Sequence, residues 1–163
     1  HPAVASTLND LGVAALQNGD YRAAEADFRR MTAIYDSVYG PQHYLMGLSR
    51  ANLASVYVRE GRYLDADTLF RTAIRTFLAT LPPDHMQTAI ARIKLGHVLV
   101  LRQRWKEAEE PLIQGYETLS SQTSPTVSWL ESARQDLVQL YEALGQPDKA
   151  AAYRAEQEDS TSG

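Results

Sequence analysis

Three histidines, His1, His43 and His85, lie 42 residues apart. Imidazole is a common metal ligand and general base, so its regular recurrence raises the question of a metal site. The ligands of one metal ion must all lie about 2 Å from it. If each step corresponds to two packed helices of ~10 Å each, neighbouring histidines are about 20 Å apart. We therefore predict turn and helix-start roles for them, and no metal or cofactor.

Two other groups of residues have types suited to acid–base chemistry. His97 has no carboxylate three or four residues away on either side, so we expect a polar or packed surface residue rather than a general base. Glu107, Glu109 and Glu110 follow Lys106, which is typical of a solvated helix surface. No set of nucleophile, base and orienting group remains, so the chain is not predicted to be an enzyme.

Three arginines, Arg50, Arg92 and Arg134, also recur every 42 residues. One interpretation is a basic ladder that grips an acidic peptide. The simpler one is ion pairing between repeats. Candidate acidic partners for such pairs are Asp65, Glu107 and Asp148.

The same 42-residue period extends through the whole chain. It predicts one helical unit copied four times, at approximately residues 1–42, 43–84, 85–126 and 127–155, with each copy covering the apolar face of its neighbour. The residues in register are Leu11-Gly12, Leu53-Ala54 and Leu95-Gly96; Ala24, Ala66, Ala108 and Ala150; and Tyr21, Tyr63 and Trp105.

Each copy has the pattern of two antiparallel helices. In the first copy, Val4, Leu8, Leu11 and Ala15 form one helical stripe, which ends near Gly19. A second helix follows, and we expect Gly12 on the first helix to face Ala24 on the second so that the two axes approach closely. The sequence predicts eight helices in four pairs. Residues 156–163 are polar and predict a disordered tail.

Composition limits the function classes. The chain has 163 residues, 44% of them hydrophobic and 22% charged, with a formal net charge of −4. This is typical of one globular domain, predicted over residues 1–155, and argues against nucleic acid as a partner. Charged residues interrupt every apolar run, so no direct membrane contact is predicted. There is no cysteine and no initiator methionine, and we expect the chain to be part of a longer protein.

The repeated unit resembles the tetratricopeptide repeat. The similarity rests on Leu11-Gly12, Gly19, Tyr21, Ala24, Phe28 and their copies. The 42-residue spacing and the turn at 39–43 are similar to the long variant found in kinesin light chains and many bacterial proteins. This resemblance implies an all-α, right-handed α-α superhelix, in which the first helices of the pairs line a concave groove.

The resemblance also implies a protein-interaction module that binds a peptide or partner protein in this groove. Only Asn52 is kept from the carboxylate clamp of the chaperone-binding branch, so apolar anchors are expected instead, and Trp129 is a further candidate anchor. The matching groove positions are Asn9, Val13, Gln17, Leu48, Asn52, Ser55, Arg59, Ile93, His97, Leu101, Gln135 and Gln139.

Two alternatives stay open. The stretches 105–109, 140–145 and 147–154 are similar to the C-terminal repeats of some bacterial Ser/Thr kinases, which implies a regulatory or scaffolding tail. The chain itself has no kinase motif. Self-association into a homo-oligomer through the exposed ends of the solenoid is the other alternative.

Overall fold

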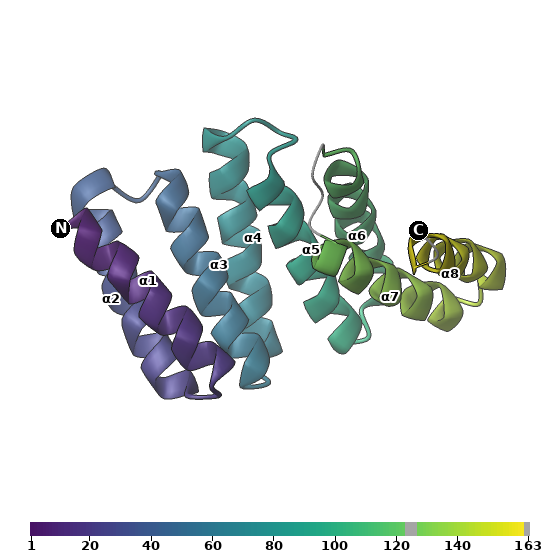
Figure 1. Ribbon diagram of the computed structural model, residues 1–163, viewed down its shortest axis with the longest axis horizontal. Helices are drawn as coiled ribbons and strands as arrows, with labels where there is room; N and C mark the ends of the chain where they lie inside the picture. Colours follow the sequence, from purple (N-terminus) through teal and green to yellow (C-terminus); the bar gives the residue numbers. More distant parts are fainter. Residues whose placement is uncertain (123–126, 162–163) are drawn as a thin grey trace. The chain divides into compact units, whose positions relative to one another are not determined.

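The computed structural model describes residues 1–122 and 127–161, and every regular element in these residues is an α-helix (Figure 1). The prediction of eight helices in an all-α repeat fold is confirmed. The helices are α1 (Pro2–Gln17), α2 (Tyr21–Tyr39), α3 (Tyr44–Arg59), α4 (Tyr63–Thr80), α5 (Met86–Leu101), α6 (Trp105–Ser120), α7 (Val127–Ala143) and α8 (Pro147–Thr161).

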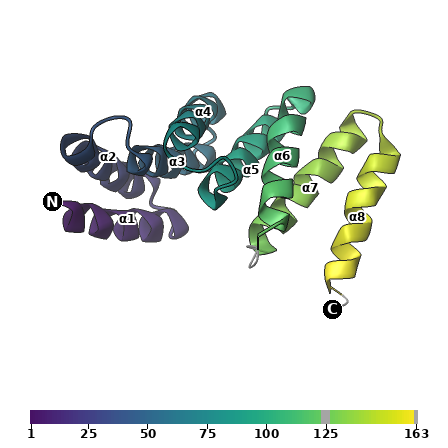
Figure 2. The same cartoon turned by 90° about the horizontal axis from the view of Figure 1, so that it is seen from above.

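The chain forms two compact units, His1–Pro83 and Asp84–Gly163, where the sequence predicts one domain. The first unit contains the pairs α1/α2 and α3/α4, with α2 packed on α3. The second contains α5/α6 and α7/α8, with α7 packed on both α5 and α6. Figure 2 shows the two members of each pair running side by side in opposite directions. No described helix has the length and apolar content needed to cross a bilayer.

The periodic histidines begin three of the first helices. In each case the imidazole Nδ1 accepts a hydrogen bond from the backbone N–H two residues later, at 3.2 Å for His1, 3.3 Å for His43 and 3.1 Å for His85. These N–H groups have no partner inside the helix, so a side-chain acceptor stabilises the helix start. The predicted helix-start role is confirmed. In the described ranges, no three His, Asp or Glu side chains are grouped to hold a metal ion.

Glycine on one helix accommodates a large side chain of its partner. A Cβ added to Gly12 would lie 2.6 Å from Cε1 of Phe28, and one added to Gly96 would lie 2.4 Å from Cγ of Leu112. The space at Gly12 is filled by the ring of Phe28. Both Phe28 and Ala24 are fully buried. The missing Cβ thus admits a ring, and the expected contact between Gly12 and Ala24 stays a prediction.

The turn inside three of the pairs uses a glycine with positive φ: 80° at Gly19, 76° at Gly61 and 69° at Gly145. In the remaining pair the same repeat position is Gln103, with a φ of 57°. A residue with a Cβ is strained in this left-handed conformation, by about 1–2 kcal/mol.

We expect Gln103→Gly to raise the free energy of unfolding by about 1 kcal/mol, because glycine relieves this strain and loses part of the gain to its greater freedom when unfolded. Denaturant titration followed by circular dichroism measures the change. Gly61→Gln is the matched reverse substitution and is expected to lose a similar amount. Equal stability of Gln103→Gly and the parent chain would show that this turn carries no strain.

Helix α8 continues through residues for which the sequence predicts a disordered tail. The Tyr116 hydroxyl of α6 donates a hydrogen bond to the Glu156 carboxylate, and Nη1 of Arg134 donates to the Glu156 carbonyl oxygen at 3.0 Å. Tyr116 also packs edge-on against Tyr153, with ring centroids 5.7 Å apart. These contacts come from other helices, so the polar composition of residues 156–161 did not reveal them. Residues 162–163 lie outside the described ranges.

Candidate peptide-binding surfaces

In the first unit, the first helices of the two pairs meet through two asparagines. Nδ2 of Asn52 on α3 donates to Oδ1 of Asn9 on α1, at 2.7 Å. Each side-chain amide has two donor hydrogens and one acceptor oxygen, so the pair retains both kinds of group after making this bond. An extended peptide backbone offers the same two kinds of group. The two asparagines are therefore suited to hydrogen-bond a peptide main chain.

The other candidates of the first unit surround this pair with mixed chemistry. Val13 is 37% exposed, and Gln17 is exposed at the end of α1. Leu48 and Ser55 are half-buried, and Ser55 donates to the carbonyl of Ala51 on its own helix, at 3.1 Å. The exposed Arg59 lies over the Tyr21 ring, 5.8 Å from its centroid.

In the second unit, His97 on α5 pairs with Asp136 on α7. The imidazole Nδ1 lies 3.0 Å from each carboxylate oxygen of Asp136. The Asp136 side chain is only 7% exposed, whereas the His97 side chain is 43% exposed. The hydrogen bond to Asp136 raises the pKa of His97, against the opposing effect of burial. Because a carboxylate only accepts, Nδ1 carries the hydrogen, so Nε2 is an acceptor in the neutral ring and becomes a donor when His97 is protonated.

The carboxylate that orients His97 was not predicted, because Asp136 lies on another helix. Asp136 lies 39 residues later, one repeat less one helical turn. Residues with this offset lie on adjacent first helices, here α5 and α7, which are packed together. A spacing of one repeat plus or minus one helical turn is therefore the sequence signal for such a pair.

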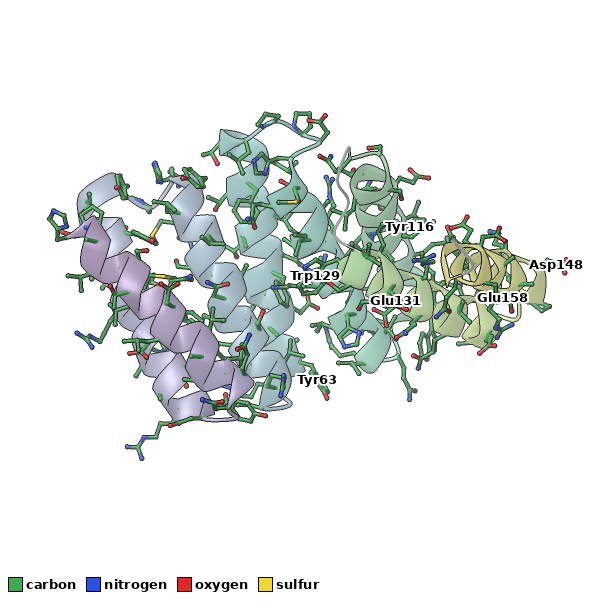
Figure 3. All side chains as sticks on the ribbon, in the orientation of Figure 1. Tyr63, Tyr116, Trp129, Glu131, Asp148 and Glu158 are labelled. Carbon is green, nitrogen blue, oxygen red and sulfur yellow. The ribbon has the colours of Figure 1, made fainter. Side chains whose placement is uncertain are left out.

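Lys94 and Trp129 make a second contact between α5 and α7. Nζ of Lys94 lies 4.9 Å from the centroid of the Trp129 ring. Figure 3 labels Trp129 on α7. Burial lowers the pKa of Lys94 to about 8. Trp129 is partly buried and packs against the apolar cluster that includes Ala89 and Leu119. Trp129 therefore contributes to the core of this unit. The sequence had suggested instead that it could be an exposed anchor for a ligand.

The remaining candidates of the second unit separate into core and surface. Ile93 is 1% exposed, belongs to the same apolar cluster as Trp129, and lies against Gly115. It cannot contact a ligand without unpacking α5 from α6. Leu101 is 41% exposed, and Gln135 is also exposed. Gln139 is exposed as well. In the structure, His97, Leu101 and the two glutamines are therefore accessible to a ligand. Ile93 is buried and is no longer a candidate binding residue.

Two of the periodic arginines, Arg50 and Arg134, make contacts inside helix pairs. Nη1 of Arg50 donates to Oγ1 of Thr76 at 3.1 Å, which joins α3 to α4. Arg134 is 6% exposed and joins α7 to α8 through the Glu156 carbonyl. Of the predicted acidic partners, Asp65 pairs with Arg62 and Glu107 with Arg104, each across one helical turn. Arg134 is too buried to grip a partner, which argues against a continuous basic ladder.

One member of the glutamate cluster links two successive pairs. The Tyr141 hydroxyl of α7 donates to Oε1 of Glu109 on α6, at 2.9 Å. In the first unit, the Tyr57 hydroxyl of α3 donates to Oε1 of Glu25 on α2, at 3.2 Å. These two pairs occupy the same repeat positions. In each, a carboxylate on the second helix of one pair bonds a phenol on the first helix of the following pair. We call this contact between successive pairs a joint, and Glu109 is a structural residue of it.

The last pair is packed less closely than the others. At the positions of Gly12 and Phe28 it has Val138 and Arg154, and a hollow of about 490 Å³ lies between α7 and α8. The side chains that line this hollow are Gln135, Val138, Arg154, Gln157 and Glu158. Arg154 also pairs with Glu142 of α7. The accessible Gln135 therefore lies at this hollow, most of whose lining side chains are polar.

The repeat architecture agrees with a family model. The tetratricopeptide repeat model matches residues 3–79 and 45–121, which together span most of the chain. The chain belongs to the tetratricopeptide repeat family. Such repeats generally mediate protein–protein interactions, and the fold is typically non-catalytic.

Solved structures share this fold at low sequence identity. The chain is similar to the nearly identical TPR-like repeats of a Podosopora anserina protein assigned as a kinesin light chain, with a TM-score of 0.82, 23% identity, and 96% of this chain and 74% of that chain covered. It is also similar to BtubC (BKLC) from P. vanneervenii, with a TM-score of 0.64, 16% identity, and 99% and 82% covered. The chain is also similar to the Sgt2 TPR domain from Aspergillus fumigatus, with a TM-score of 0.59 and 16% identity. This similarity covers 98% of this chain and 82% of that chain.

No curated protein sequence matches the chain significantly. At these identities the structural similarity establishes the fold, and the partner has to be inferred from the surface of this chain.

Proposed function

We propose that this chain is a non-catalytic module that binds a peptide, or an extended segment of a partner protein, on the surfaces of its first helices. The observation that carries the proposal is His97, whose Nδ1 is held by the buried carboxylate of Asp136 while its side chain is 43% exposed. A side chain fixed in this way is oriented before a ligand arrives, which lowers the entropic cost of binding.

The neighbours of His97 define the chemistry of the ligand. Leu101 is one helical turn further along α5 and 41% exposed, so it offers an apolar contact beside the imidazole ring of His97. Gln135 and Gln139 are one turn apart on α7 and offer amide groups to a peptide backbone. This combination is suited to a segment with an acidic side chain one turn from an apolar one.

The pKa of His97 gives this interaction a pH dependence. Because the pKa is raised, the imidazolium persists above the ordinary value of about 6.5 and is lost as the pH rises through the raised pKa. Below that value a protonated His97 attracts a carboxylate, and above it the attraction is lost. The affinity for an acidic peptide is therefore expected to fall with rising pH, whereas that for a neutral peptide is not.

The test uses a fluorescein-labelled library of peptides that combine Glu or Asp with Leu, and the matching library with Gln or Asn. We expect His97→Ala and Leu101→Ala each to weaken binding of the best acidic peptide about tenfold, since one charged hydrogen bond or one apolar contact is worth about 1.4 kcal/mol. Asp136→Asn is expected to move the pH midpoint to lower pH. Fluorescence anisotropy measures both effects.

Gln114→Ala, on the exposed side of α6, is the matched control and is expected to bind normally. Binding that is insensitive to His97, Leu101 and Asn52 alike would place the ligand elsewhere and refute the assignment of these surfaces.

The kinase-tail alternative stays a prediction. Its support is the similarity of residues 105–109, 140–145 and 147–154 to the ends of such kinases. The sequence upstream of residue 1 in the parent gene decides it. The net charge of −4 supports a protein rather than a nucleic acid as the partner.

A further inference from the structure

Helix α1 has an exposed apolar face whose counterparts elsewhere in the chain are buried. Val4 is 46% exposed and Leu11 is 53% exposed, although both belong to the same predicted stripe as Leu8, which is 3% exposed. One repeat later, Met46 is 3% exposed and Leu53 is 8% exposed. The face itself is therefore built in the same way on α1 and α3, and the difference is in what covers it.

On α3 this face is covered by the second helix of the preceding pair. Met46 and Leu53 of α3 line a hollow of about 350 Å³ together with Arg29 and Asp36 of α2. Nη2 of Arg29 also donates to the Tyr57 hydroxyl, at 2.7 Å. The exposed face of α1 is thus shaped to receive a helix of the same type as α2.

The residues at the joints indicate which helix would fit. Both joints described above bury a phenol against a carboxylate, Tyr57 with Glu25 and Tyr141 with Glu109. On α1 the phenol position is Ala15. A covering helix with a glutamate at the facing position would bury a carboxylate with no phenol to bond it, which is costly.

Helix α8 lacks that glutamate. Its residue at the repeat position of Glu25 is Ala151, and at the position of Arg29 it has Ala155. Both alanines are exposed. If α8 of one copy covers α1 of another, Ala151 meets Ala15, and both members of the polar pair are absent together. This matched replacement favours a second copy as the occupant.

The charges agree with the same orientation. Successive helices in a joint are antiparallel, so the C-terminal part of α8, which has Glu158 and Asp159, would lie beside the N-terminus of α1. The positive end of the α1 dipole is there, and it stabilises nearby carboxylates by about 0.3–1 kcal/mol each.

We propose that copies of this chain associate head to tail, with α8 of one copy packed on Val4 and Leu11 of α1 of the next. Such an interface joins two different surfaces, so every open assembly keeps one free α1 and one free α8 and grows with concentration. This association is separate from peptide binding on the first-helix surfaces and uses none of the residues assigned to it.

Sedimentation velocity of the chain of residues 1–163 over a hundredfold concentration range tests the proposal. We expect the weight-average mass to rise with concentration. Leu11→Glu and Ala151→Glu are each expected to weaken association at least tenfold, because each places a charge in the buried contact. Leu64→Glu, at a position 65% exposed on α4, is the control and is expected to associate like the parent chain.

Mixing the two variants gives the decisive result. Leu11→Glu retains an intact α8 and Ala151→Glu an intact α1, so their equimolar mixture is expected to form a dimer that grows no further. A parent chain that stays monomeric throughout would overturn the proposal. A mixture that stays monomeric would also overturn it, as would self-association of Ala151→Glu alone. Circular dichroism spectra that match the parent chain exclude misfolding as the cause.

Discussion

Gly115→Ala is expected to lower the free energy of unfolding of the second unit by up to about 2 kcal/mol. A Cβ at this position would lie 2.7 Å from the carbonyl oxygen of Ala89 and 2.7 Å from Cγ1 of Ile93. The carbonyl belongs to the backbone of α5 and cannot rotate away, so α5 and α6 must separate. The overpacking cost of about 1–3 kcal/mol outweighs the gain of about 1 kcal/mol from replacing glycine by alanine in a helix.

The preceding repeat provides a matched rescue of this variant. At the positions of Ala89, Gly115 and Leu119 it has Gly47, Ala73 and Phe77. There the glycine is on the first helix, and a Cβ added to Gly47 would lie 2.7 Å from Cε1 of Phe77. The two repeats therefore place one glycine and one alanine on opposite helices.

We expect the triple variant Ala89→Gly/Gly115→Ala/Leu119→Phe to be more stable than Gly115→Ala alone, because it reproduces the packing of the preceding repeat. Urea denaturation followed by circular dichroism compares the two. A triple variant less stable than the single one would show that the two repeats do not share this packing, and an unchanged Gly115→Ala would show that the helices separate freely.

Phe28→Ala is expected to lower the free energy of unfolding of the first unit by about 3–5 kcal/mol. Phe28 is fully buried, and its ring lies in the space left by Gly12. Removal of the ring leaves a cavity that Gly12 cannot fill, and large-to-small substitutions of buried aromatic residues cost this much.

Phe28→Leu is the matched control. The same repeat position is Leu112 in the third pair, where it lies against Gly96. Leucine is thus already used against glycine in this fold, and we expect Phe28→Leu to lose less than half of what Phe28→Ala loses. Denaturant midpoints of the two variants give the comparison. Equal losses would mean that the contact depends on the aromatic ring rather than on filled volume.

Much of the fold is predictable from local spacing. The 42-residue period places the first and second helices, and His43 and His85 begin helices where the turns require it. These features depend on residues close together in the chain, within one helix or one turn. The left-handed turn conformation at Gln103 is an exception, because the repeat imposes it on a residue that does not favour it.

The candidate site was predicted less completely, because its geometry depends on contacts between helices. The resemblance to the repeat family implies that His97 and Ile93 lie on the same surface, yet the structure half-exposes one and buries the other. The packing of α5 on α6 and α7 decides between these outcomes. The carboxylate of Asp136 was missed for the same reason, since it reaches His97 from another helix.

The sequence by itself determined the repeat, its paired helices and the residues that begin and end them. These follow from periodicity and from backbone groups that must be satisfied locally. Only the tertiary structure decided that Phe28 fills the space at Gly12, that Asp136 orients His97 and that α1 has an uncovered face. Such contacts depend on the relative placement of helices, which arises from the packing of many side chains at once and is not encoded at any single spacing.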